Sequence, residues 1–183
     1  MEGSADTREK LARFEAVVLP HLDAAYNLAR WMTRNASDGE DVAQEAMLRA
    51  FRFFDGFRGE DGRVWLMTIV RNTYLTWIRR QMPQQNSAEF DERVHTDIEA
   101  ALTPESQLLR QATAEQVRRG IEHLPAEYRE VILMRELEQM SYKEIAAITQ
   151  SPLGTVMSRL SRGRSMLRQL IASERRAEVK HHG

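Results

Sequence analysis

Apolar side chains recur every three or four positions along most of this 183-residue chain, and no stretch alternates apolar and polar residues between turn signals. The first pattern is typical of amphipathic α-helices, whereas alternation is typical of half-buried strands. The sequence therefore predicts an all-α fold. Hydrophobic residues make up 42% of the chain and charged residues 29%, which indicates a packed core rather than a disordered chain.

The amino-terminal third contains the first two predicted helices. One apolar stripe spans residues 14–32 and predicts a single helix that ends near Arg34. Ser37 and Glu40 have the spacing of a capping box, in which each side chain bonds the other residue's backbone amide. They predict the start of a second helix, which ends at the glycine-containing loop 55–59.

A third helix is predicted over residues 62–80, with Trp65 and Trp77 in a core that the three helices share. Residues 83–103 have no sustained apolar period, which favours a flexible linker between two domains. Between residues 88 and 105 six acidic residues accompany a single arginine, so the linker is acidic.

The second domain begins with Thr103 and Pro104, a cap and a first-turn proline, which predict a helix through Ile121. A further helix is expected after Pro125. The letters SYKE at 141–144 form another capping box, which predicts a short helix.

A tight turn at Ser151 and Pro152 separates that short helix from a longer one, and the pair forms a helix-turn-helix. Val156, Leu160 and Leu167 of the longer helix are expected to face inward. Its opposite face is polar and cationic, as in helices that enter the DNA major groove. A solvated face is the simpler alternative, but the helix-turn-helix context favours DNA.

Several classes of function lack support in the sequence. The chain has no cysteine, no glycine-rich phosphate loop, no metal-ligand spacing among its histidines, and no nucleophile beside a base. We therefore expect a binding protein without catalytic residues, metal or cofactor. No signal peptide or membrane-spanning run is found, so a cytoplasmic protein without membrane insertion is predicted.

Three segments resemble the sigma factors of bacterial RNA polymerase, in the extracytoplasmic-function group of the sigma-70 family. DGEDVAQEAMLRAF resembles region 2.2, and FRGEDGRVWLMTIVRNTYLTWIRR resembles regions 2.3 and 2.4. LPAEYREVILMRELEQMSYKEIAAITQSPLGTVMSRLSRGRSML resembles region 4. The resemblance implies a region 2 domain at 1–82, the linker at 83–103, a region 4 domain at 104–175 and a disordered tail at 176–183.

The resemblance also assigns three binding surfaces. The surface for core polymerase, at its clamp coiled coil, comprises Asp38, Asp41, Gln44, Glu45, Leu48 and Arg49. The surface that opens and holds the minus-10 promoter element comprises Arg63, Asn72, Thr76, Arg79 and Arg80. The surface that reads the minus-35 element comprises Ser151, Thr155, Met157, Ser158, Arg159 and Arg162.

Two of these positions depart from the family's usual residues. Met157 stands where lysine is common, and Thr76 stands where aspartate is common. The resemblance further implies contact with the polymerase flap, promoter-specific initiation of transcription, and control by an anti-sigma factor. The main alternative is a two-domain regulator that binds duplex operators without joining polymerase, and a helical adaptor that binds only proteins is a third interpretation.

Overall fold

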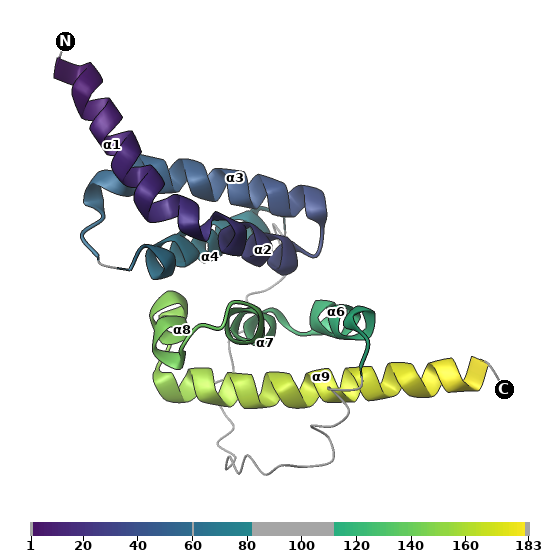
Figure 1. Ribbon diagram of the computed structural model, residues 1–183. Coiled ribbons are helices and arrows are strands. Elements are labelled where there is room, and N and C mark those ends of the chain that lie inside the picture. The colour runs from purple at the N-terminus through teal and green to yellow at the C-terminus, as the bar shows by residue number, and fades with distance from the viewer. Residues whose placement is uncertain (1, 60, 82–111, 182–183) are drawn as a thin grey trace.

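The computed structural model describes residues 2–59, 61–81 and 112–181. These residues form helices and connecting loops without a strand, which confirms the all-α prediction. The helices group into two bundles, coloured purple to teal and green to yellow in Figure 1. Within the described ranges, none of the helices combines the length and the apolar character that crossing a membrane requires.

The first bundle contains the helices α1 (Glu2–Val18), η1 (Leu19–His21), α2 (Leu22–Thr33), α3 (Ala36–Phe53), η2 (Phe54–Gly56) and α4 (Gly62–Gln81). The prediction of one helix over residues 14–32 is wrong, because a 3-10 turn that contains Pro20 separates α1 from α2. Proline lacks the amide hydrogen that a continuous helix needs. Figure 1 shows the amino-terminal half of α1 extending away from the bundle.

The cap of α3 also differs from the prediction. Asn35, not Ser37, is the N-cap, and its side-chain oxygen accepts hydrogen bonds from the amides of Ser37 at 2.9 Å and Asp38 at 3.3 Å. Asparagine is among the best capping residues because its short side chain reaches the free amides of the first turn. The predicted capping box at this helix therefore does not form.

The core of the first bundle lies between α2, α3 and α4. Its fully buried side chains include Leu28, Met32, Val42, Ala46, Leu66 and Val70. Trp65 and Trp77 are partly buried and pack against this core, as predicted. At Gly39 the helices α2 and α3 approach so closely that a Cβ atom would lie 2.6 Å from the Cα of Arg30.

The second bundle contains α6 (Ala114–His123), α7 (Ala126–Ile132), the π-helical turn η3 (Leu133–Leu137), α8 (Tyr142–Thr149) and α9 (Leu153–His181). The predicted helix start at Thr103 lies outside the described residues. That helix does not run unbroken to Ile121, because Thr113 has extended backbone angles and caps α6 in a capping box with Gln116. Helix α9 continues to His181, past residue 176 where a disordered tail was predicted.

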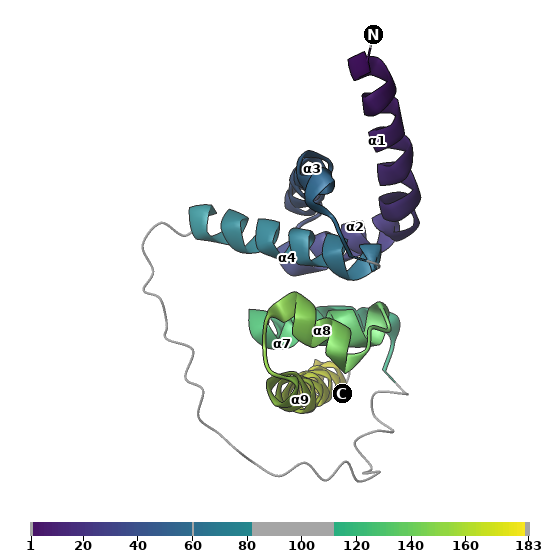
Figure 2. The same cartoon turned by 90° about the vertical axis from the view of Figure 1, so that its left-hand side faces the viewer.

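The two bundles contact each other along one side. Figures 1 and 2 both show α2 and α4 of the first bundle facing α7 and α8 of the second. Arg129 on α7 is buried and donates hydrogen bonds to the carbonyl oxygens of Met32 on α2 at 3.0 Å and of Leu124 at 2.8 Å. Arg34 donates a hydrogen bond to the same Leu124 oxygen at 3.0 Å. These contacts hold the bundles together through arginine and backbone carbonyl groups.

Candidate functional site

The first predicted surface lies on the outer face of α3. The opposite face of this helix is buried through Val42, Ala46 and Ala50, which fixes its rotation. Four of the predicted residues are therefore exposed, namely Asp41, Gln44, Glu45 and Leu48, while Asp38 and Arg49 are partly buried.

This α3 surface combines charge with one apolar side chain. Leu48 is 58% exposed, and the carboxylate of Glu45 accepts a hydrogen bond from Nε of Arg49 at 2.7 Å. The pair has the spacing of an ordinary exposed helical ion pair, which contributes a few tenths of a kcal/mol, about 0.3–0.5. Because the Glu45–Arg49 pair contributes so little to stability, breaking it in order to bind a protein partner of complementary charge would cost little free energy.

The second predicted surface is divided in the structure. Asn72, Arg79 and Arg80 are exposed on the carboxy-terminal half of α4, and Thr76 lies between them with its hydroxyl donating to the Asn72 carbonyl oxygen at 2.9 Å. Arg79 and Arg80 occupy the last turn, where positive charge interacts favourably with the helix dipole. These four residues form a continuous polar strip.

Arg63, the fifth residue of this set, lies at the other end of α4. Its guanidinium donates to the main-chain oxygen of Glu138 and lies 3.4 Å from the carboxylate of that residue. Glu138, which provides both of these groups, belongs to the second bundle. The structure therefore separates Arg63 from the strip formed by Asn72, Thr76, Arg79 and Arg80.

The third predicted surface is the helix-turn-helix of α8 and α9. The capping box that begins α8 is confirmed, since the Ser141 amide donates to Glu144 Oε2 at 2.6 Å and the Glu144 amide donates to Ser141 Oγ at 3.2 Å. Gln150 ends α8 with a left-handed φ of 52°. Pro152 comes directly before α9, and its carbonyl accepts the Val156 amide at 3.1 Å.

The inward face of α9 is the one that the sequence predicts. Val156, Leu160 and Leu167 are buried, and Gly163 lets α9 approach Ile132 on α7. Of the predicted minus-35 residues, Met157 is exposed, and the other five are partly buried, namely Ser151, Thr155, Ser158, Arg159 and Arg162.

Arg159, one of the predicted base-reading residues, has a side chain that is 16% exposed. Its Nη1 donates to the hydroxyl of Ser151 at 3.2 Å and lies 4.0 Å from Oε1 of Glu130 on α7. Glu130 itself is only 5% exposed and was not among the residues that sequence reasoning selected. A signal was present, because a carboxylate within the apolar run EVILM requires a cationic partner when that run is buried.

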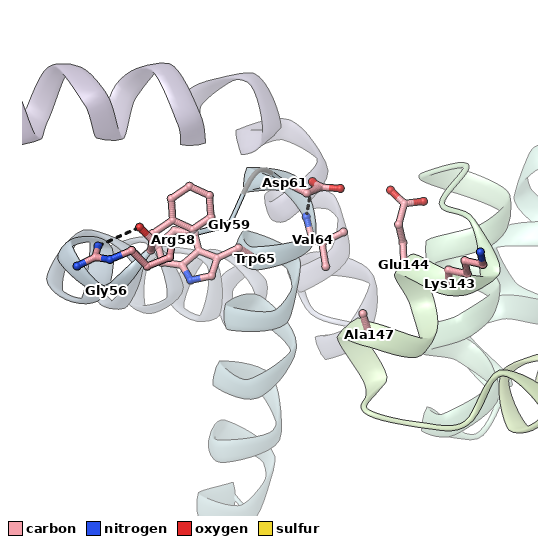
Figure 3. A pocket seen from close by; sticks show the side chains of 10 residues that line it. Gly56, Arg58, Gly59, Asp61, Val64, Trp65, Lys143, Glu144 and Ala147 are labelled. Atoms are coloured by element: carbon pink, nitrogen blue, oxygen red, sulfur yellow. Dashed lines mark hydrogen bonds between the residues drawn. The ribbon is translucent and has the colours of Figure 1, made fainter.

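A cavity of about 770 Å³ opens where the two bundles meet. Figure 3 shows loop residues and the start of α4 on one side, namely Gly56, Arg58, Gly59, Asp61, Val64 and Trp65, and Lys143, Glu144 and Ala147 of α8 on the other. Asp61 caps the start of α4 here by accepting from the amides of Arg63 and Val64, each at 3.0 Å. No group of acidic or histidine side chains suited to a metal ion occurs in the described part of the chain.

Burial and nearby charge shift the pKa values of two groups at the junction, Arg129 and Tyr74. Burial lowers the pKa of the Arg129 guanidinium, and the nearby charge of Arg34 acts in the same direction. Burial raises the pKa of the Tyr74 hydroxyl, which the positive charges of Arg129 and Arg34 counteract. The two arginines lie close together because both donate hydrogen bonds to the carbonyl oxygen of Leu124.

The order of these surfaces along the chain matches two family models. Residues 17–83 match the model described as Sigma-70 region 2, and residues 114–167 match Sigma-70, region 4. The first match contains the α3 surface and the α4 strip, and the second contains the helix-turn-helix.

Relatives and solved structures agree with these matches. The RNA polymerase sigma-H factor of Pseudomonas aeruginosa is 35% identical over 164 residues, which cover 84% of this chain and 83% of that protein. The ECF RNA polymerase sigma-E factor of Escherichia coli K12 is 36% identical over 151 residues, covering 78% of this chain and 79% of that protein.

The sigma factor RpoE from Bartonella quintana, solved in complex with the anti-sigma factor NepR, has a TM-score of 0.68 and 25% identity, covering 87% of this chain and 97% of that chain. CnrH, solved with the cytosolic domain of CnrY, shares the fold with a TM-score of 0.60 and 23% identity, covering 87% and 88%. On these grounds the chain belongs to the extracytoplasmic-function group of the sigma-70 family of RNA polymerase sigma factors.

Proposed function

We propose that this protein binds core RNA polymerase and directs it to promoters that it recognises at their minus-35 and minus-10 elements. The observation that carries the proposal is the presence of sigma regions 2 and 4, in that order, on one chain. An operator-binding regulator has no need of region 2, so this alternative is not favoured. The protein supplies recognition and strand opening in the cytoplasm, while polymerase supplies catalysis.

Each surface has a role in this proposal. The α3 surface docks on the polymerase clamp coiled coil, where its charges provide specificity and association rate. The α4 strip of Asn72, Thr76, Arg79 and Arg80 holds the opened minus-10 strand. Unstacking a base costs a few kcal/mol, which stacking and backbone contacts offset.

Helix α9 reads the minus-35 duplex from the major groove. Arg159 is the candidate for a bidentate bond to guanine, and the hydroxyls of Ser151, Thr155 and Ser158 suit bases or phosphates. Met157 and Arg162 complete this face. Region 4 also contacts the polymerase flap.

Control by an anti-sigma factor is part of the proposal. RpoE and CnrH, which resemble this chain, were solved in complex with NepR and with the cytosolic domain of CnrY. A partner of this kind would inhibit the protein by covering its polymerase-binding surface. A pull-down that recovers core polymerase alone, from stressed and unstressed cells alike, would count against such control.

Reconstituted transcription tests the function. Purified core polymerase, the protein and a library of promoter fragments should yield transcripts with defined start sites. The double variant Asp41→Lys/Glu45→Lys should abolish polymerase binding and transcription, whereas Glu9→Lys/Glu15→Lys, which makes the same charge change on exposed positions of α1, should not. If the unchanged protein binds duplex DNA but never directs initiation, the chain is an operator-binding regulator.

A further inference from the structure

The amino-terminal end of α9 exposes apolar groups instead of polar ones. Among residues 151–160 the exposed positions are Pro152, Leu153, Gly154 and Met157, and none of them has a polar side chain. Leu153 is 43% exposed and Met157 is 41% exposed. Among the described residues, no atom lies within 4 Å of a Cβ added at Gly154, so the space beside this turn is open.

The polar side chains of the same stretch are engaged within the protein. The Ser158 hydroxyl donates to the Thr155 carbonyl oxygen at 3.0 Å, and the Ser151 hydroxyl donates to the Thr149 carbonyl oxygen at 3.3 Å. Arg159 donates to the Ser151 hydroxyl at 3.2 Å. The side chains that this end of α9 presents most fully to a partner are therefore the apolar ones.

Leu153 and Met157 form what we call the apolar pair. They are four positions apart, so they lie on one face of the helix, about 6 Å apart along its axis. Val156 and Leu160 are buried in the core, which fixes the rotation of α9 and leaves the apolar pair exposed. Single exposed apolar side chains are common on protein surfaces. This pair, however, lies at the amino-terminal end of the second helix of a helix-turn-helix, the part that contacts base edges in such proteins.

Thymine is the base that presents an apolar group in the major groove. It has a C5-methyl group beside its O4 acceptor, whereas guanine, adenine and cytosine present hydrogen-bonding groups there. Each step of the duplex rises about 3.4 Å, so two side chains about 6 Å apart can reach thymines one or two base pairs apart. Neither leucine nor methionine carries a charge that neutralises a phosphate, so a base contact suits this pair better than a backbone contact.

We infer that the apolar pair reads thymine methyl groups, and that the minus-35 element of this protein contains thymine where Leu153 and Met157 meet the groove. This inference rests on the proposed function, because it takes α9 as the helix that reads that element. Leu153 thereby joins the minus-35 surface, and Met157 acquires a specific role within it.

Uracil tests the inference directly, because it keeps the hydrogen-bonding groups of thymine and lacks only the methyl group. The minus-35 sequence is first selected from a randomised promoter library by the holoenzyme, which is this protein bound to core polymerase. Each thymine of the selected element is then replaced in turn by deoxyuridine, and holoenzyme affinity is measured by fluorescence anisotropy. At one or two thymines the replacement should weaken binding by about fourfold, as expected when one methyl group is no longer buried.

Variants of the apolar pair assign each effect to a side chain. Met157→Ala should bind the thymine and uracil duplexes equally at one position, and Leu153→Ala should do so at the other. Both positions are exposed, so neither truncation removes core packing. Leu11→Ala is the matched control, because it truncates a leucine of the same 43% exposure on α1, and it should leave both differences unchanged.

Four results would contradict the inference. A selected element without thymine, or an affinity that uracil leaves unchanged, would overturn it while the proposed function stands. A uracil effect that persists in both variants would overturn it by assigning the methyl contact to another residue. Weaker binding to core polymerase in the variants, with the thymine–uracil difference intact, would overturn it by assigning the pair to a protein contact. Failure of the unchanged protein to direct initiation would instead refute the proposed function, and the inference with it.

Discussion

The close approach of α2 and α3 at Gly39 predicts a measurable loss of stability when a single methyl group is added. In Gly39→Ala the new Cβ would lie 2.6 Å from the Arg30 Cα and 3.1 Å from the Arg30 nitrogen. Both atoms belong to the backbone of a packed helix, so the two helices must move apart. Overpacking of this kind costs about 1–3 kcal/mol, and the better helix propensity of alanine returns about 1 kcal/mol.

Because the contacts are with backbone atoms, the cost lies in the upper part of that range, at about 2–3 kcal/mol. Subtracting about 1 kcal/mol for helix propensity leaves a net destabilisation of about 1–2 kcal/mol, which corresponds to a decrease in melting temperature of roughly 4–16 °C for a domain of this size. Gly56→Ala is the matched control, because no atom lies within 4 Å of its added methyl group. Alanine there restricts the unfolded chain and should stabilise the domain by about 0.4–1 kcal/mol.

Tryptophan emission during urea unfolding measures the change in stability that each of the two variants, Gly39→Ala and Gly56→Ala, causes. The chain has three tryptophans, Trp31, Trp65 and Trp77, and all of them belong to the first bundle. Their emission therefore reports unfolding of the bundle that contains both glycines. Equal shifts of the urea midpoint in the two variants, or no loss in Gly39→Ala, would refute the packing argument.

Three other predictions concern single side chains. Asn35→Ala removes the cap of α3 and should destabilise the first bundle by about 1 kcal/mol in the tryptophan-monitored titration. Ser141→Ala removes half of the α8 capping box and should cost a similar amount, about 1 kcal/mol, visible in far-ultraviolet circular dichroism but not in tryptophan emission. Arg159→Ala should weaken binding of a minus-35 duplex by about 1–3 kcal/mol, measured by fluorescence anisotropy, and an unchanged affinity would exclude a bidentate base contact.

The sequence correctly predicted the features of single helices, because capping and apolar spacing depend only on residues that are close along the chain. The capping box at Ser141 and the inward face of α9, with Val156 and Leu160, are confirmed because each depends on spacing within one helix. The third helix, predicted over residues 62–80, is confirmed in α4 for the same reason. The family resemblance, carried by motif order, correctly identified the function class.

The errors have equally local causes. The apolar stripe over residues 14–32 continued across Pro20, so periodicity alone gave one helix where the structure has a break. Asn35 and Ser37 are both good caps, and only backbone geometry decides that Asn35 serves. Glu130, by contrast, was missed because its partners Arg71 and Arg159 lie 59 and 29 positions away, beyond any helical repeat.

The polar character of the junction bears on what happens when the bundles part. The hydrogen bonds described there connect arginine side chains to carboxylates and carbonyl oxygens, for example Arg71 to Glu130 and Arg129 to Met32. Water forms hydrogen bonds with arginine, carboxylate and carbonyl groups once their contacts across the junction are broken. Separation at these points would expose arginine, carboxylate and carbonyl groups to water, which can replace each lost hydrogen bond.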